Sequence, residues 1–214
     1  MDLKLIFLVI LGVVSIVYLI TLFFKDSILQ YILKACLVPL ILAVYLSGAN
    51  IILLPIILAL VFGWLGDVFL LKISNLLCFR LGLASFLLGH IFYIITMFTY
   101  SQPLNHIIIL IISILVAVCY GIVIFKFIQP TKEMKIPVIA YETILLTMAV
   151  FALQFFLAHW SKLGAFVFVG SIFFVVSDSM LALATFRKKA LNVPVMFTYI
   201  AAQLLIVLGF GMMG

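Results

Sequence analysis

Apolar stretches of about 20 residues recur along the whole chain, and only short polar breaks separate them. This is the length of helix that crosses the hydrocarbon core of a bilayer. Hydrophobic residues make up 69% of the 214 residues and charged residues only 8%, whereas a soluble domain needs a largely polar surface. The sequence therefore predicts an integral membrane protein, with one transmembrane domain over residues 1–214 and no soluble domain between the spans.

The apolar runs divide the chain into eight expected membrane spans. They cover residues 3–24, 28–46, 51–71, 81–100, 107–127, 136–157, 163–186 and 193–213. The runs lack the period-two alternation of barrel strands, so continuous helix is the expected conformation. The fold class that follows is an all-α bundle of eight transmembrane helices.

Basic residues fall mainly on one side of these spans. That side collects ten of the twelve Lys and Arg residues: Lys25, Lys34, Lys72, Arg80, Lys126, Lys132, Lys135, Arg187, Lys188 and Lys189. The other side keeps Lys4 and Lys162. Because short cytoplasmic loops are enriched in Lys and Arg, we expect the basic loops in the cytoplasm and both termini on the non-cytoplasmic side. The net charge of +6 is then a topology signal and does not indicate a nucleic-acid partner.

Four titratable side chains lie inside the apolar spans: Asp67, His90, Glu142 and Asp178. Charge at membrane depth is costly, so such residues mark functional sites by default. With a helical rise of about 1.5 Å per residue, all four fall between the cytoplasmic boundary and the midplane of the membrane. Their common depth predicts one polar cavity that opens toward the inner leaflet.

Helical spacing brings further residues to this depth. One face of the fourth span carries Gly82, Phe86, His90, Tyr93 and Met97. Residues three or four apart share a helix face, so His90 and Tyr93 should point to the same place. Tyr199 and Gln203, four residues apart in the last span, add polar groups at a similar depth.

Glycines precede two of these polar groups. Gly63 and Gly66 come before Asp67, and Gly89 comes directly before His90. Small residues in membrane helices allow a neighbouring backbone to approach closely. We therefore expect close helix packing beside these two polar groups.

Each polar group also has a structural interpretation. Asp67 and Asp178 would form ion pairs at helix ends, although their basic neighbours lie five and nine residues away, a poor spacing for contact on one helix. A neutral His90 would bridge helices. Glu142, near a helix start, would complement the helix dipole. Lys34 would extend to the membrane interface and serve structure alone.

The two halves of the chain carry a faint internal symmetry. Lys34, Asp67 and His90 are followed by Glu142, Asp178 and Gln203 at offsets of about 110 residues. The corresponding spans run in the same direction. A parallel repeat of four plus four helices would place a site between the two halves.

Four short segments within the spans carry the polar groups: residues 66–70 (GDVFL), 86–93 (FLLGHIFY), 177–182 (SDSMLA) and 199–204 (YIAAQL). Together they resemble the YhhN-like lysoplasmalogenases. Their order and spacing on an eight-span frame make the combination specific, and the resemblance runs over most of the chain. The family often has Lys-Pro in its second span, where this chain has Lys34 followed by Ala35.

The resemblance implies hydrolysis of the vinyl ether bond of lysoplasmenyl-ethanolamine or lysoplasmenyl-choline, which releases a fatty aldehyde and a glycerophospho-alcohol. Vinyl ethers hydrolyse when an acid protonates the alkene carbon and water captures the resulting oxocarbenium ion. Two carboxyl groups in an apolar site can serve as acid and anion, because burial and mutual repulsion keep one protonated while the other stays ionised. Glycosidases use a similar pair.

Asp67 and Asp178 are the expected catalytic pair, in either order of roles. The residues expected to orient substrate or water are His90, Tyr93, Glu142, Tyr199 and Gln203. Neither a metal nor a cofactor is expected. The expected substrate is a lysophospholipid of the inner leaflet, whose chain lies between helices and whose phosphate meets Lys and Arg at the cytoplasmic face. The compact chain favours a multi-pass protein of a bacterial inner membrane, with its site in the cytoplasmic half.

Two other functions fit the same residues. In a metal-dependent intramembrane lipid hydrolase, Asp67, His90, Glu142 and Asp178 would bind zinc and activate water, although a single histidine is few for such a site. In a proton-coupled transporter of small molecules or lipids, the acids would relay protons. The pairs of helix-breaking Pro and Gly residues that transporters use at the midplane are largely missing.

Overall fold

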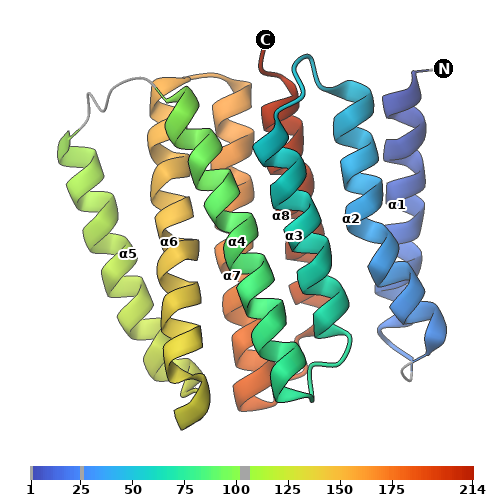
Figure 1. Ribbon diagram of the computed structural model, residues 1–214, viewed down its shortest axis with the longest axis vertical. Helices are drawn as coiled ribbons and strands as arrows, with labels where there is room; N and C mark the ends of the chain where they lie inside the picture. The colour runs from blue at the N-terminus through green and yellow to red at the C-terminus, as the bar shows by residue number, and fades with distance from the viewer. Residues whose placement is uncertain (1, 25–26, 102–106) are drawn as a thin grey trace.

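The computed structural model describes residues 2–24, 27–101 and 107–214. These residues form eight α-helices and one short 3-10 helix, and they contain no strand. In chain order the elements are α1 (Leu3–Thr21), α2 (Ile28–Gly48), α3 (Leu54–Leu70), α4 (Leu76–Tyr100), α5 (Ile107–Ile128), η1 (Lys132–Met134), α6 (Lys135–Ala158), α7 (Lys162–Arg187) and α8 (Asn192–Gly211) (Figure 1). The all-α fold class is therefore confirmed.

Seven of the helices in the described residues are long and apolar enough to cross a membrane, which fits a multi-pass membrane protein. The eighth, α3, is an apolar helix of 17 residues. It begins at Leu54 instead of residue 51, with Pro55 in its first turn. Proline is tolerated there because N–H groups in the first turn have no hydrogen-bond partner within the helix. Just before it, the backbone N–H of Leu53 donates to the Tyr45 hydroxyl at 2.8 Å. The late start shortens α3 at the end remote from Asp67.

The start of α4 also differs from the prediction. The helix begins at Leu76 instead of residue 81. The reason is a cap, because the Asn75 side chain accepts hydrogen bonds from the backbone N–H groups of Leu77 and Cys78. Arg80, which was expected in a loop, therefore belongs to the first turns of α4.

The helices stand side by side in one bundle, with both termini at the same end (Figure 1). α7 packs against α8, α3 against α4 and α1 against α2, and α4 contacts α6 across the bundle. α1 and α5 lie at opposite edges (Figure 1). Of the residues in α5, only Ile128 is buried, so the helix faces outward over most of its surface, and it packs against α6 and α7.

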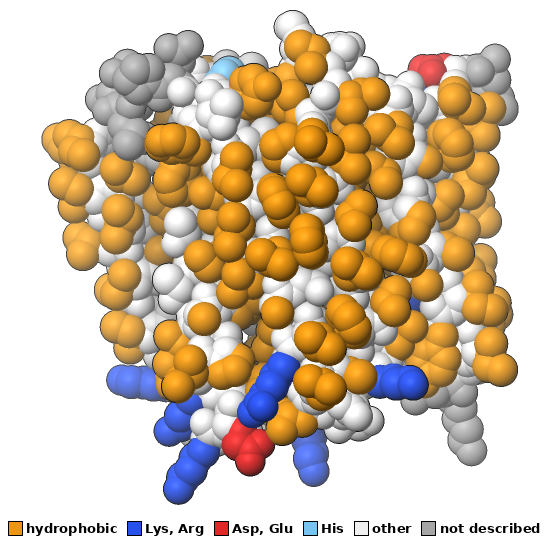
Figure 2. Space-filling view, viewed as in Figure 1, with side chains coloured by type: hydrophobic (Ala, Val, Ile, Leu, Met, Phe, Trp, Pro, Cys, Tyr) orange, Lys and Arg blue, Asp and Glu red, His pale blue; other side chains and the backbone are white. Residues whose placement is uncertain are grey.

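Lys and Arg side chains gather at the end of the bundle opposite the termini, which we call the basic end (Figure 2). An exposed acid at this end, Glu133, lies 3.9 Å from Arg80. Lys4 and Lys162 lie in the first turns of α1 and α7, at the other end. Lys25 is outside the described residues. That the basic end faces the cytoplasm stays a prediction.

The helix contacts have a pattern that bears on the four-plus-four repeat. If α1 to α4 correspond to α5 to α8, the contact of α6 with α4 has its counterpart in the contact of α2 with α8. The tight pair α3 and α4 corresponds in the same way to the tight pair α7 and α8. The repeat itself stays a prediction.

α3 and α4 approach each other closely at the level of the candidate site. A Cβ atom added at Gly89 would lie 3.0 Å from the carbonyl oxygen of Ala59 on α3. At Gly66 an added Cβ would meet the ring of Phe86 at 2.6 Å. Both glycines therefore allow the short helix separation that holds Asp67 near the centre of the bundle.

We expect Gly89→Ala to lower the free energy of unfolding by roughly 1–3 kcal/mol, because the added methyl group meets the backbone of α3. The measurement is thermal unfolding of the purified protein in detergent. Gly12→Ala is the matched control, since an added Cβ at Gly12 meets nothing within 4 Å. The control should unfold at the same temperature as wild type or slightly above it. Equal unfolding temperatures for the two variants would contradict the close packing of α3 and α4.

Candidate active site

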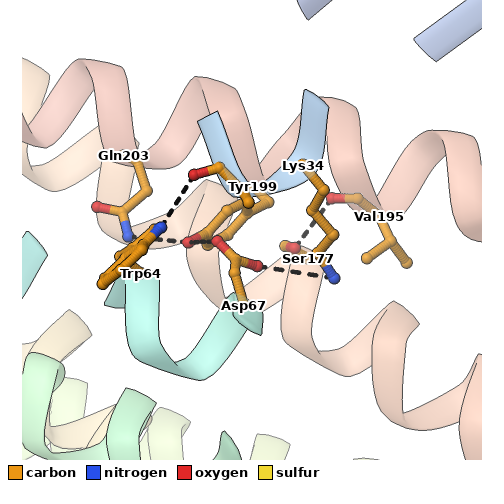
Figure 3. Close-up of polar contacts among 8 residues, drawn as sticks. Lys34, Trp64, Asp67, Ser177, Val195, Tyr199 and Gln203 are labelled. Atoms are coloured by element: carbon orange, nitrogen blue, oxygen red, sulfur yellow. Dashed lines mark hydrogen bonds and ion pairs between the residues drawn. The ribbon is translucent and has the colours of Figure 1, made fainter. Parts of the chain in front are cut away.

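Asp67 is the centre of a buried polar cluster (Figure 3). Its side chain comes from α3 and is 3% exposed. The Nζ atom of Lys34, on α2, lies 3.7 Å from Asp67 Oδ1. The hydroxyl of Tyr199, on α8, donates a hydrogen bond to Asp67 Oδ2 at 2.7 Å. Both contacts stabilise the ionised form of the carboxyl group.

A chain of hydrogen bonds extends this cluster to α4. The Tyr93 hydroxyl donates to Gln203 Oε1 at 2.7 Å, and Gln203 Nε2 donates to the Tyr199 oxygen at 3.4 Å. Each donor points along the chain toward Asp67, which is its final acceptor. The structure thus places three of the residues predicted from sequence around Asp67, where they orient that carboxylate.

Lys34 is held beside Asp67 by an irregularity in α2. Pro39 lies inside this helix and has no N–H, so the carbonyl of Ala35 lacks its usual partner one turn later. The indole N–H of Trp64, on α3, donates to this carbonyl at 2.9 Å (Figure 3). The bond joins α2 to α3 at the level of the ion pair. The expectation that Lys34 extends to the interface is therefore wrong, because its Nζ turns toward the carboxylate.

Asp178, on α7, lies in a different setting. The hydroxyl of Tyr141, on α6, donates a short hydrogen bond to Asp178 Oδ2. Among the described residues, no cation forms an ion pair with Asp178, and its side chain is only partly buried. The preceding residue, Ser177, donates to the carbonyl of Val195 at 3.0 Å and so ties α7 to α8 (Figure 3). The two acids therefore differ in charge partner and in exposure.

The position of the proton on His90 follows from its one hydrogen bond. His90 Nδ1 lies 2.5 Å from the carbonyl oxygen of Phe86, which can only accept, so Nδ1 carries the hydrogen. In the neutral ring Nε2 is then an acceptor. This atom is buried and has no hydrogen-bond partner among the described residues. His90 can therefore accept a hydrogen bond from a water or a substrate hydroxyl.

A row of rings connects the two acids. Centroid distances are 5.6 Å from Tyr199 to Phe174, 4.7 Å from Phe174 to His90 and 5.6 Å from His90 to Tyr141. The hydroxyls at the two ends of the row bind the two carboxyl groups. The predicted pair thus borders one aromatic site, with the imidazole between its members.

Glu142 lies apart from this network. It is 8% exposed, and its Oε1 has no hydrogen-bond partner among the described residues. It borders a cavity between α5 and α6 with a volume of about 760 Å³. The described residues around this cavity include none of the other residues predicted for the site. Of the four titratable groups, Glu142 is therefore the one that faces outward from the cluster.

The zinc alternative requires a cluster of ligands. In the part of the chain that the structure describes, no group of three or more His, Cys, Asp or Glu side chains is placed to hold a metal ion. The four residues proposed as ligands instead divide among an ion pair, a tyrosine hydrogen bond, a backbone carbonyl and the α5–α6 cavity. The geometry gives this alternative no support.

Sequence reasoning missed three residues that hold the acids in place: Tyr141, Trp64 and Ser177. Tyr141 precedes Glu142, and Ser177 precedes Asp178, so in each pair the adjacent acid was predicted as the site residue. A tyrosine hydroxyl at membrane depth was the available signal, since a buried O–H needs a partner. Trp64 gave no such signal, because its partner is created by Pro39 in another helix.

Fold and site together define a helical membrane protein in which one buried and one partly buried carboxyl group lie among aromatic rings and hydroxyls. The comparison with known families agrees with the resemblance seen in the sequence. The profile of the YhhN family matches residues 29–210, and the chain therefore belongs to the YhhN family. Membership supports a lysoplasmalogenase-like hydrolase in broad terms. No curated protein and no solved structure was found to match the chain.

Proposed function

We propose that this protein is a lysoplasmalogenase, which adds water across the vinyl ether bond of a lysoplasmenyl lipid and releases a fatty aldehyde and a glycerophospho-alcohol. The observation that carries the proposal is the unlike environment of the two acids. Asp67 has a cation and an O–H donor, whereas Asp178 has, among the described residues, only the Tyr141 hydroxyl. A reaction through an oxocarbenium ion needs one carboxylate and one carboxylic acid.

We assign Asp67 the role of the anion. The Lys34 ammonium and the Tyr199 hydroxyl keep this group ionised and fix its direction before the substrate arrives. A preorganised negative charge stabilises the positive charge that develops in the transition state, and it does so strongly in a site that excludes water. Tyr93 and Gln203 act through Tyr199 and are positioning residues.

We assign Asp178 the role of the proton donor. It transfers its proton to the alkene carbon, and the neighbouring carbon bonded to the ether oxygen becomes the oxocarbenium centre. Water then adds to this centre and returns a proton to the Asp178 carboxylate. The hemiacetal loses its hydroxyl proton as the carbon–oxygen bond to glycerol breaks, and the released alcohol takes up a proton. The balance is one vinyl ether and one water consumed, and one aldehyde and one alcohol formed.

His90 is the residue that we expect to orient the water. Its Nε2 is an acceptor without a partner among the described residues, and its ring contacts both Tyr141 and Phe174. A water bound to Nε2 would therefore lie between the two acids. General bases and water-orienting groups act across a single hydrogen bond of this kind.

The proposed site lies in the half of the bundle nearest the basic end, which we place in the cytoplasm. Asp67 lies one turn from the end of α3, and Asp178 lies nine residues before Arg187 at the end of α7. A lysophospholipid of the inner leaflet would present its phosphate to the Lys and Arg side chains at this end. We propose a bacterial inner membrane as the location.

Release of aldehyde from lysoplasmenylethanolamine by the purified protein in detergent tests the proposed function. We expect aldehyde and glycerophosphoethanolamine in equal amounts, with the rate unchanged by a metal chelator. Acyl lysophosphatidylethanolamine, which has an ester in place of the vinyl ether, is the matched control and should release no aldehyde. The proposal would be overturned by a folded protein that produces no aldehyde, or by aldehyde release that stops when chelator is added.

Tyr199→Phe tests the network around Asp67. The variant keeps the ring contacts but removes the donor to Asp67 and the acceptor for Gln203. We expect turnover to fall about 10- to 100-fold, as when the partner that orients a catalytic group is lost. The measurement is the initial rate of aldehyde release. Tyr31→Phe, at a tyrosine that is 43% exposed, should retain the wild-type rate. An unchanged rate in Tyr199→Phe would contradict the proposal that the Tyr199 hydroxyl orients the Asp67 carboxylate for catalysis.

A further inference from the structure

Among the described residues, the polar contacts that hold α5 to the bundle lie in the half of the helix nearest the basic end. The Tyr120 hydroxyl forms a hydrogen bond of 2.7 Å with Ser179 Oγ on α7. Beyond the end of α5, Arg187 donates to Gln129 Oε1 at 2.6 Å. In the described residues of the other half of α5, we find no side-chain hydrogen bond or ion pair to another helix. No polar contact among these residues therefore draws α5 against α6, and a space remains between the two helices.

This space is the cavity of about 760 Å³ noted above, which we call the α5–α6 groove. Its volume falls within the range of about 300–1,000 Å³ that is usual for small-molecule sites. Apolar side chains make up most of its walls, among them Leu110, Ala117, Leu146 and Phe151. Ile122 and Ile139 on its rim are 54% and 49% exposed, so the groove opens sideways to the lipid-facing surface.

Two buried polar side chains face the groove. Glu142 is 8% exposed and Gln154 is 5% exposed. Glu142 Oε1 and Gln154 Nε2 have no hydrogen-bond partner among the described residues. Buried polar atoms are almost always paired, so Glu142 Oε1 indicates that a polar group of the bound molecule reaches this end of an otherwise apolar groove.

The groove is as long as one half of a membrane. From Glu142 to Gln154, α6 rises by about 18 Å. Half of the hydrocarbon core is about 15 Å thick. The exposed cation of Lys126 borders the groove at the end where Glu142 lies. A molecule with a phosphate, a hydroxyl and one hydrocarbon chain matches this order of cation, acceptor and apolar wall.

The end of the groove at Glu142 is linked through neighbouring residues to the proposed proton donor. Glu142 follows Tyr141, whose hydroxyl binds Asp178. Ser179, on the other side of Asp178, binds Tyr120 of α5. A chain that enters the groove at Glu142 therefore begins one residue along α6 from the tyrosine that binds the acid.

We infer that the α5–α6 groove binds the single hydrocarbon chain of the lipid substrate, with the glycerol hydroxyl near Glu142, the phosphate near Lys126 and the chain end toward Gln154. The inference rests on the proposed function and adds the site that presents the vinyl ether to Asp178. It also gives the aldehyde product a direct route sideways into the bilayer.

Photolabelling tests this site without turnover. The probe is acyl lysophosphatidylethanolamine with a diazirine in the middle of its chain, because the proposed reaction does not cleave the ester. After illumination in lipid nanodiscs, we expect the label in residues 110–126 and 139–154, and excess lysoplasmenylethanolamine should prevent it. The outward face of α1 gives the background from bulk lipid. Labelling of the groove no stronger than this background would overturn the inference.

Ala117→Trp fills the groove, and Val116→Trp is its matched control, since Val116 is 63% exposed and does not border the groove. We expect about tenfold weaker groove labelling and an about tenfold higher KM for a long-chain substrate in Ala117→Trp alone. Leu146→Trp fills the groove from α6 and serves if Ala117→Trp does not fold. Equal labelling and KM in a folded groove variant and in Val116→Trp would contradict the inference.

The outcomes separate this inference from the proposed function. Aldehyde release by a wild-type protein that is not labelled in the groove would overturn the inference alone. Groove labelling of a wild-type protein that releases no aldehyde would leave a lipid site and overturn the proposed function. Crosslinks that join two copies of the protein through α5, in place of lipid labelling, would identify the groove as an interface between copies and would also overturn the inference.

Discussion

Asp178→Asn is expected to lower the rate of aldehyde release by roughly 10² to 10⁴-fold, the contribution usual for a general acid. The amide cannot give a proton to the alkene carbon, but its oxygen can still accept the hydrogen bond from Tyr141. We therefore expect a folded protein with wild-type thermal stability and very little turnover. The measurement is the single-turnover rate, with lipid binding recorded on the same sample.

Glu133→Gln is the control for this variant. Glu133 is an exposed carboxyl group at the basic end, paired with Arg80 on the surface. Its loss should leave the rate unchanged, because surface pairs contribute little. If Asp178→Asn turns over at nearly the wild-type rate, Asp178 is not the proton donor and the assignment of roles is wrong.

Asp67→Asn is expected to reduce both turnover and stability. The variant removes the anion that offsets the developing positive charge, which we expect to cost about 10²-fold or more in rate. It also leaves the Lys34 ammonium, whose side chain is 16% exposed, without its partner. Loss of one member of a buried pair destabilises a protein by up to about 3–5 kcal/mol, and the partial exposure of Lys34 should reduce this figure. Aldehyde release and thermal unfolding measure the two effects.

A double variant separates the two roles of Asp67. Lys34→Met combined with Asp67→Asn removes the unpaired charge and should restore most of the stability, because apolar replacements of buried ion pairs are often neutral. Turnover should stay low, since the anion is still missing. Recovery of turnover together with stability would show that Asp67 serves the fold alone.

Much of the fold follows from the length of the apolar runs, because each helix needs about 20 apolar residues to cross the bilayer core. Helix ends were harder to predict, since they depend on local hydrogen bonds. α4 starts early because Asn75 caps it, and α3 starts late because Leu53 pairs with Tyr45. Which helices are neighbours is not contained in the periodicity of single helices. The contact of α4 with α6 therefore came only from the structure.

The candidate site was predictable in depth but not in its pairings. Equal depth brought Asp67, Tyr199 and Gln203 into one set, and the structure joins them by hydrogen bonds. The partners of Asp178 and Lys34 depend on how helices are placed side by side, so depth could not show them. Glu142 shares the depth but faces α5, because adjacent positions on a helix point about 100° apart.

The most direct test of the mechanism is hydrolysis of lysoplasmenylethanolamine in heavy water. Asp178 exchanges its proton with solvent, so its transfer to the alkene carbon places solvent hydrogen on the carbon beside the aldehyde group. We predict fatty aldehyde with one deuterium at this carbon, detected by mass spectrometry after immediate trapping, and a lower rate than in ordinary water. Aldehyde without this deuterium, or no aldehyde from a folded protein, would contradict vinyl ether hydrolysis by a carboxyl acid.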